Sequence, residues 1–139
     1  MPKDVDPVEL AARALQHRDR SRRDVDERLA KAGIDEDRRA EALDTLARVG
    51  YVDDQRFARA RAGALADRGY GDEWIRHDLG EHGVEGVTAD EAIAELAPER
   101  ERAAAVIERL GPGPKTAAHL GRKGFGEDAL ELAVAGTEG

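Results

Sequence analysis

The segment formed by residues 21–46 recurs fifty positions later, as residues 71–96. The matched positions hold apolar residues and one glycine: Val25 falls on Ile75, Leu29 on Leu79, Gly33 on Gly83, Ile34 on Val84, Leu43 on Ile93 and Leu46 on Leu96. A weaker third copy has Thr116, Leu120, Gly124, Phe125 and Val134 in these slots. Because so short a repeat cannot bury its apolar face alone, its copies must stack. The repeat predicts an extended surface for a large partner, not one catalytic pocket.

The amino-acid usage indicates that the stacked units are helical. Only 4% of the residues are aromatic and 37% are charged, so the core must come mainly from Leu, Val, Ile and Ala. Alanine, arginine and glutamate are abundant, and runs of β-branched residues are missing. These residues favour small helices over a sheet. The sequence therefore predicts an all-α fold.

Start and stop signals divide the chain into short helices. Side chains suited to capping a helix N-terminus stand before apolar, helix-spaced runs at Asp6, Ser21, Asp35, Asp53 and Thr88. The Thr88 signal predicts the start of the sixth helix. Glycines at positions 33, 83 and 124 suit helix C-termini. The signals predict an elongated array of three tandem three-helix repeats, resembling helix-turn-helix units. Their expected bounds are 1–50, 51–97 and 98–139, the last including a mobile C-terminal tail.

The sequence carries no signal for export or membrane insertion. It has no cysteine, which excludes a disulfide framework and cysteine-ligated zinc. No apolar stretch approaches the roughly 18 residues that a membrane-spanning helix requires. The first residues, MPKDVDPVEL, lack the apolar core of a signal peptide. We expect a cytoplasmic protein without membrane contact.

No set of residues predicts catalysis or a metal centre. The four histidines do not form a metal-binding motif, since His77 and His82 are five positions apart. Ser21 is the only serine, and a capping role is sufficient for it. Helix capping also explains the pair Asp53-Asp54, and no phosphate-binding loop of the form GxxxxGK[ST] occurs. We therefore expect no enzymatic activity, no metal and no cofactor.

Charge is distributed unevenly along the chain. The formal net charge is −8, which argues against non-specific DNA binding over the whole surface. Residues 13–31 nevertheless carry a net charge of +3 and residues 55–76 carry +2, whereas residues 77–110 carry −6. Such polarity suits a partner of mixed charge, such as a protein–nucleic acid assembly.

The string G-Y-V-D-D-Q-R-F-A at residues 50–58 resembles the G-Y-x-D-D-x-R-F-A motif of the RecX family of recombination regulators. Three further blocks resemble that family in the same order. They are Ser21 with Val25, Leu29, Gly33 and Ile34; residues 68–71 (RGYG) with Ile75 and Leu79; and residues 122–125 (RKGF). Together the motifs extend over roughly residues 8–135, and their ordered occurrence makes the resemblance specific.

The resemblance implies a non-enzymatic modulator of RecA, the recombinase that polymerises on single-stranded DNA. Members of the family lie in the groove of the RecA filament and generally inhibit its ATPase and strand exchange, which limits recombination and the SOS response. The expected partners are RecA and its single-stranded DNA filament, with weak direct DNA binding possible and a monomeric chain. The alternative is a stand-alone DNA-binding module of the helix-turn-helix type. A generic helical adaptor is the third hypothesis.

Ten residues are candidates for contacting the partner or DNA. The basic ones could form a strip along the front half of the chain, although paired surface arginines are equally typical of solvated helices. The aromatic ones stand beside turns, where they could be surface anchors or core residues. The candidates are Arg20, Arg22, Arg23, Tyr51, Arg56, Arg59, Arg61, Arg68, Tyr70 and Arg76. Phe57 and Phe125, in contrast, are expected in the core.

Overall fold

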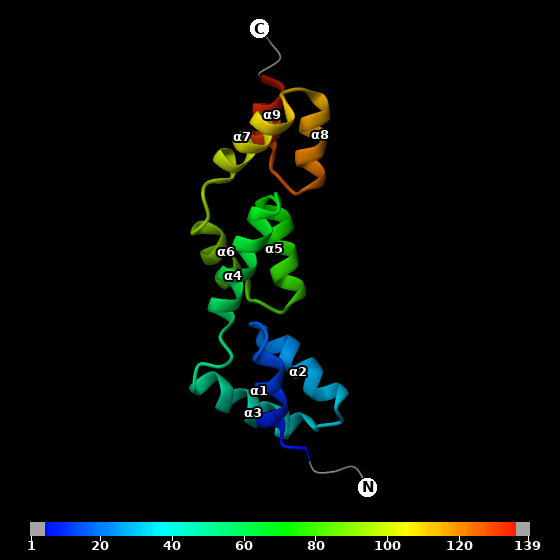
Figure 1. The fold of residues 1–139 in the computed structure, drawn as a ribbon, viewed down its shortest axis with the longest axis vertical. Helices are drawn as coiled ribbons and strands as arrows, with labels where there is room; N and C mark the ends of the chain where they lie inside the picture. The colour runs from blue at the N-terminus through cyan, green and yellow to red at the C-terminus, as the bar shows by residue number, and fades with distance from the viewer. Residues whose placement is uncertain (1–4, 136–139) are drawn as a thin grey trace.

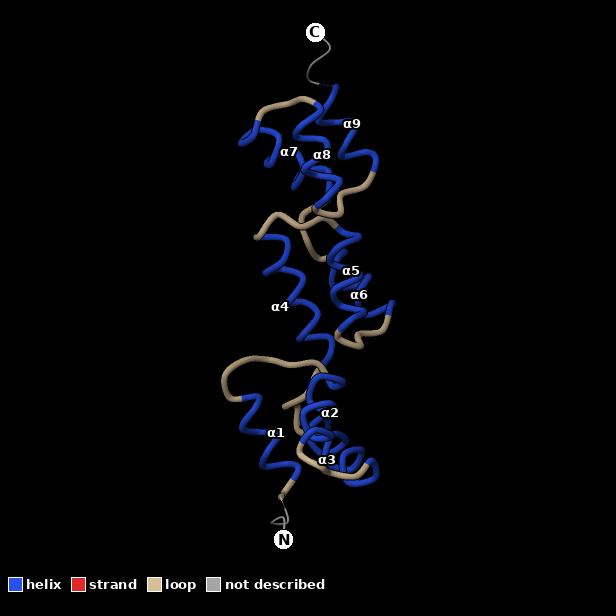
Figure 2. Tube along the Cα trace, turned by 90° about the vertical axis from the view of Figure 1, so that its right-hand side faces the viewer, coloured by secondary structure: helices blue, strands red, loops and turns tan. Residues whose placement is uncertain are grey.

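The structure is a computed structural model and describes residues 5–135. This part of the chain forms nine helices and no strand, which confirms the all-α prediction (Figures 1 and 2). The helices are α1 (Pro7–Leu15), α2 (Arg22–Lys31), α3 (Glu36–Arg48), α4 (Asp54–Asp67), α5 (Asp72–Glu81), α6 (Gly86–Ala94), α7 (Glu99–Leu110), α8 (Pro114–Arg122) and α9 (Glu127–Ala135). The predicted mobile tail falls largely on residues 136–139, outside the described residues.

The helices stack as three groups of three along one long axis. Figure 1 shows α1–α3 at one end, α4–α6 in the middle and α7–α9 at the other end. We call these groups the first, second and third units. The arrangement confirms the prediction of an elongated array of three-helix repeats. The bounds 1–50, 51–97 and 98–139 remain predictions.

Each unit has its own small cluster of buried side chains. The first is built around Val25, Leu29, Leu43 and Leu46, the second around Phe57, Leu65, Ile75 and Leu79, and the third around Val106, Leu120 and Phe125. Val52, although it precedes α4, packs in the first cluster. Each buried aliphatic side chain stabilises the fold by about 1.5–3 kcal/mol. Because the clusters are small, contacts between units add to the stability of each one.

Side-chain caps fix the starts of the first four helices. Asp6, Ser21, Asp35 and Asp53 each accept a hydrogen bond from a backbone N–H in the first turn of α1, α2, α3 and α4. These four predicted caps are confirmed. Each satisfies an N–H that has no partner within its helix.

The predicted start of the sixth helix at Thr88 is wrong. Helix α6 begins at Gly86, with Glu85 at the N-cap position and Thr88 already inside the helix. Val84 is buried directly after the turn at Gly83, as Ile34 is after Gly33. Glu85 therefore occupies the slot of Asp35, although its side chain makes no capping hydrogen bond. Burial of Val84 decides where the helix starts, and the capping motif at Thr88 does not.

The second helices of the three units run head to tail. The N-terminus of α2 lies on the C-terminal turn of α5, where Ser21 Oγ donates a 2.6 Å hydrogen bond to the His82 carbonyl. The N-terminus of α5 lies likewise on the C-terminal turn of α8, where Gly71 N–H donates to the Lys123 carbonyl at 2.8 Å. Carbonyls at a C-terminus and amides at an N-terminus carry opposite partial charges, so both contacts are favourable. We call them the first joint and the second joint.

Candidate functional site

The first joint gathers half of the ten candidate residues, and it is built around Ser21 and His82. Ser21 is fully buried, and its hydroxyl accepts from Asp24 N–H while donating to the His82 carbonyl. The His82 ring lies 2.7 Å from Asp24 through Nδ1, and its centroid lies 5.3 Å from that of Phe57. The capping role expected for Ser21 is confirmed, and the same hydroxyl also links two units.

Arg61 and Asp78 form a largely buried ion pair in this region. Asp78 is 6% exposed, and three hydrogen bonds of 2.8–3.2 Å connect its carboxylate to the Arg61 guanidinium. Hydrogen bonding to Asp78 raises the pKa of Arg61 above its ordinary value, against the opposing effect of burial. This pair joins α4 to α5 within the second unit. Arg61 is therefore committed to an internal partner.

Arg56 is also used inside the molecule. Its Nε donates to both oxygens of Asp19 at 3.1 Å, which ties α4 to the loop that precedes α2. Its two terminal nitrogens donate to the carbonyls of Gly50 and Tyr51 at 2.8 and 3.2 Å. Arg56 thus holds the link between the first two units in place.

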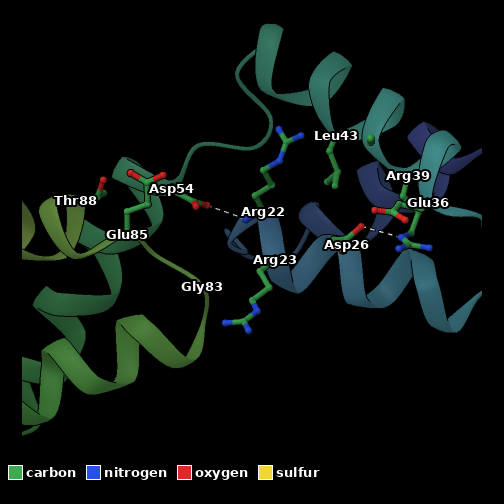
Figure 3. A pocket seen from close by; sticks show the side chains of 11 residues that line it. Arg22, Arg23, Asp26, Glu36, Arg39, Leu43, Asp54, Gly83, Glu85 and Thr88 are labelled. Atoms are coloured by element: carbon green, nitrogen blue, oxygen red, sulfur yellow. Dashed lines mark hydrogen bonds and ion pairs between the residues drawn. The ribbon is translucent and has the colours of Figure 1, made fainter.

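Two clefts flank the first joint. The larger, of about 610 Å³, lies between α2 and α3 on one side and the start of α4, the α5–α6 turn and α6 on the other (Figure 3). Figure 3 shows the Arg22 and Arg23 side chains pointing to opposite sides of α2. Arg22 pairs with Asp44 at 2.7 Å, whereas the polar contacts of the exposed Arg23 within residues 5–135 are long, 3.5 Å to the Gly80 carbonyl and 3.9 Å to Glu27. Arg23 is therefore the more available of the two.

Asp54 takes a role that the sequence did not predict. It accepts a 2.8 Å hydrogen bond from the Arg22 backbone N–H, as the dashed line in Figure 3 marks. Asp53 caps its own helix α4, as expected. Asp54 instead satisfies the first amide of α2 in the neighbouring unit.

The smaller cleft, of about 490 Å³, opens on the α1–α2 loop and on α4. Its basic side chains are Arg18, Arg20 and Arg61, and its acidic ones are Asp19 and Asp24. Phe57, Ala60, Ala64 and His82 complete the lining. Arg20 Nε donates to the Ala14 carbonyl at 3.1 Å, which leaves its terminal nitrogens to other partners.

The remaining candidates lie apart from the first joint. Arg59 is 3.9 Å from Glu95, a loose and exposed pair. Arg76 donates to Asp90 and Glu73 at 2.9 and 2.7 Å, and hydrogen bonding to Asp90 raises its pKa. Arg68 is exposed and has no side-chain partner among residues 5–135. The structure therefore distributes the predicted basic strip over several surfaces.

The two aromatic candidates, Tyr51 and Tyr70, also lie in different parts of the molecule. Tyr51 is 56% exposed, next to the exposed Val49. Tyr70 stacks on Trp74 with ring centroids 4.0 Å apart, and Lys123 Nζ lies 3.7 Å from the Tyr70 centroid. Tyr70 thus belongs to the second joint, and Tyr51 remains a surface residue. Phe57 and Phe125 are buried, as predicted.

Among residues 5–135, no group of three or more His, Asp or Glu side chains is placed to hold a metal ion. Within the same range, no helix is long and apolar enough to cross a membrane.

Comparison with known proteins identifies the family. The model described as "RecX, second three-helix domain" matches residues 53–93. The regulatory protein RecX of Xanthomonas oryzae pv. oryzae is 33% identical over 142 aligned positions, covering 95% of this chain and 89% of that protein. RecX of Acidithiobacillus ferrooxidans is 34% identical, covering 96% of this chain and 92% of that protein.

Solved structures agree with the fold. The crystal structure of RecX from Lactobacillus salivarius matches with a TM-score of 0.80 at 20% identity, covering 94% of this chain and 93% of that one. At 20% identity this similarity concerns the fold alone. The family assignment rests on the sequence relatives, one of which is 33% identical over 95% of the chain. The resemblance first suggested by the ordered motifs is confirmed, and the chain belongs to the RecX family of regulatory proteins.

Proposed function

We propose that this chain binds the filament that RecA forms on single-stranded DNA, within its groove, and inhibits its ATPase and strand exchange. It would thereby limit recombination and the SOS response. The observation that carries the proposal is the 33% identity to a regulatory protein RecX along 95% of the chain. The chain would act in the cytoplasm, as a monomer and without enzymatic activity of its own.

The shape of the molecule supports this role. Three units stacked along one axis offer a long contact surface (Figure 1). Such a surface is better suited to binding a polymeric partner than to binding a small ligand. Three of the candidate arginines, Arg20, Arg23 and Arg68, form no hydrogen bond with a carboxylate among residues 5–135 and supply positive charge on a chain of net charge −8. Complementary charges of this kind mainly set the rate and specificity of association.

The test is a titration of the chain into the single-stranded-DNA-dependent ATPase reaction of RecA from the same organism. Co-sedimentation with preformed filaments should run in parallel. We expect inhibition together with filament binding, at ratios up to about one chain per binding site. A folded chain that neither binds filaments nor changes the ATPase rate contradicts the proposal.

A third experiment distinguishes the proposed function from the alternative, a stand-alone DNA-binding module. Binding to duplex and to single-stranded DNA is measured without RecA at several salt concentrations, because affinity for phosphates falls steeply with salt. Tight, sequence-dependent binding to duplex DNA alone would favour a stand-alone DNA-binding module. We expect only weak binding, since the net charge of −8 opposes it.

A further inference from the structure

The smaller cleft of the first joint has a feature that the family assignment does not explain. Of its three arginines, only Arg61 is neutralised, by Asp78. The two lining carboxylates are engaged as well, Asp19 with Arg56 and Asp24 with His82. Among the described residues, neither Arg18 nor Arg20 forms an ion pair or a hydrogen bond with a carboxylate. The cleft therefore holds two arginines that have no ion-pair partner in that part of the chain, and the Asp24 carboxylate lies near enough to Arg20 to act on its charge.

The electrostatics around Arg20 agree with this excess. The pKa of Arg20 is lowered from its ordinary value, first by burial and then by repulsion from Arg18 and Arg28, while only Asp24 acts in the opposite direction. A guanidinium surrounded by other guanidinium groups favours the approach of an anion. The cleft is thus an electropositive site on a chain of net charge −8.

The remaining lining is apolar. Phe57 forms part of the wall and is 7% exposed, and the methyl groups of Ala60 and Ala64 on α4 lie beside it. The cleft volume of about 490 Å³ is within the range of protein sites that bind small groups. An occupant that fits both parts has one anionic group beside an apolar one.

Two classes of anion occur in a protein–DNA filament, and the lining favours one of them. A single-stranded DNA backbone places a phosphate at every nucleotide and is normally followed by a continuous basic groove. Here Asp19 and Asp24 stand within the same lining and would repel successive phosphates. A single carboxylate side chain brings one negative charge instead of a row of them, so Asp19 and Asp24 oppose it less, and arginine binds carboxylates in a paired geometry.

We propose that the cleft between the α1–α2 loop and α4 receives a Glu or Asp side chain, flanked by apolar residues, from the protein component of the filament. This inference rests on the proposed function, because it specifies the partner group that the cleft contacts. It assigns Arg18, which the sequence motifs did not single out, and Arg20 to the same binding site.

A charge reversal tests the proposal. The double variant Arg18→Glu/Arg20→Glu should weaken filament binding about tenfold or more, measured by co-sedimentation at fixed salt, because close charge pairs dominate such contacts. The matched control is Arg100→Glu/Arg109→Glu, which makes the same charge change at exposed positions of the third unit and should alter affinity less than about twofold. Circular dichroism melts establish that both variants are folded.

A site-specific crosslink identifies the occupant. The chain has no cysteine, so Ala60→Cys provides a single attachment point for a benzophenone probe at the cleft, and Ala104→Cys provides one on α7. We expect the probe at position 60 to crosslink to a recombinase peptide that contains Asp or Glu next to an apolar residue. Adding the Arg18→Glu/Arg20→Glu change should abolish that product.

The outcomes separate this inference from the proposed function. If the unmodified chain does not bind filaments, both fail. If it binds and the double variant binds equally well, only the cleft proposal is overturned. A crosslink from position 60 to DNA, or to a recombinase peptide without an acidic residue, overturns it too.

Discussion

The two joints of the array use the same elements but differ in how closely the backbones approach. In the second joint, a Cβ added at Gly71 would lie 2.5 Å from the carbonyl carbon of Gly124 and from the nitrogen of Phe125. In the first joint, the equivalent position is Ser21, whose hydroxyl bridges to the His82 carbonyl. The second joint is therefore a direct backbone contact, whereas the first is mediated by side chains.

In both joints, an arginine–aspartate ion pair connects the two units. In each, an arginine from the first helix of one unit reaches an aspartate near the second helix of the preceding unit: Arg56 reaches Asp19, and Arg102 reaches Asp72. The Arg102 side chain is only 12% exposed, whereas that of Arg56 is 39% exposed. The clefts lined by Arg20, Arg22 and Arg23 both flank the first joint. The more open joint is therefore also the one whose flanking clefts are lined by arginines.

The largest effect is expected from Gly71→Ala. The new methyl group would overlap backbone atoms of the third unit, which cannot move aside as a flexible side chain can. We expect a loss of about 3 kcal/mol in the free energy of unfolding, at the upper end of overpacking costs. Urea unfolding measures it, and amide exchange at Gly71 and Glu73, which donate to Lys123 and Gly124, should speed up.

A glycine of the same helix provides the control for that change. A Cβ at Gly80 on α5 would meet no atom within 4 Å. Gly80→Ala should therefore stabilise the protein by about 0.5–1 kcal/mol through helix propensity alone. Equal effects of the two substitutions would show that the second joint is not a close backbone contact.

Arg102→Gln should have the next largest effect, because it removes the partly buried ion pair of the second joint. Arg102 donates to Asp72 at 2.8 Å and to the Ala97 carbonyl at 2.9 Å. We expect a loss of about 2 kcal/mol, as for hydrogen bonds to charged groups. Thermal and urea unfolding measure it, and a loss below about 0.5 kcal/mol would contradict a structural role for this arginine.

Ser21→Ala tests the first joint directly. The variant loses the N-cap of α2 and the bond to the His82 carbonyl. We expect a loss of about 1–2 kcal/mol, because a capping hydroxyl contributes about 1 kcal/mol and one further hydrogen bond adds to it. Denaturant unfolding compares this value with that of Asp35→Ala, which removes a cap without any contact between units. A smaller loss for Ser21→Ala than for Asp35→Ala would exclude a contribution from the joint.

The smallest effect is expected from Arg56→Gln. Its pair with Asp19 is partly exposed, so solvent screens it and the loss should be about 0.5 kcal/mol. Raising the salt concentration should reduce this difference further, while the Arg102→Gln difference should persist. Unfolding curves of both variants at low and high salt make the comparison. An effect of Arg56→Gln equal to that of Arg102→Gln would remove the distinction between the joints.

The sequence by itself determined the elements and their repetition. The caps at Asp6, Ser21, Asp35 and Asp53 and the glycine turns depend on residues a few positions apart, so local pattern was sufficient to predict them. The ordered motifs also pointed to the RecX family, because they record the same spacing of caps, turns and buried residues. The one start that failed, Thr88, shows a local capping motif overruled by burial of Val84.

Only the tertiary structure decided which polar groups meet. Arg61 lies 17 positions from Asp78, and Asp24 lies 58 positions from His82, so no local pattern could pair them. The same packing committed Arg56 and Arg61 to internal carboxylates and left Arg18 and Arg20 without them. Charge along the sequence gives the number of basic side chains, but their availability depends on which acidic groups the joints bring within hydrogen-bonding distance.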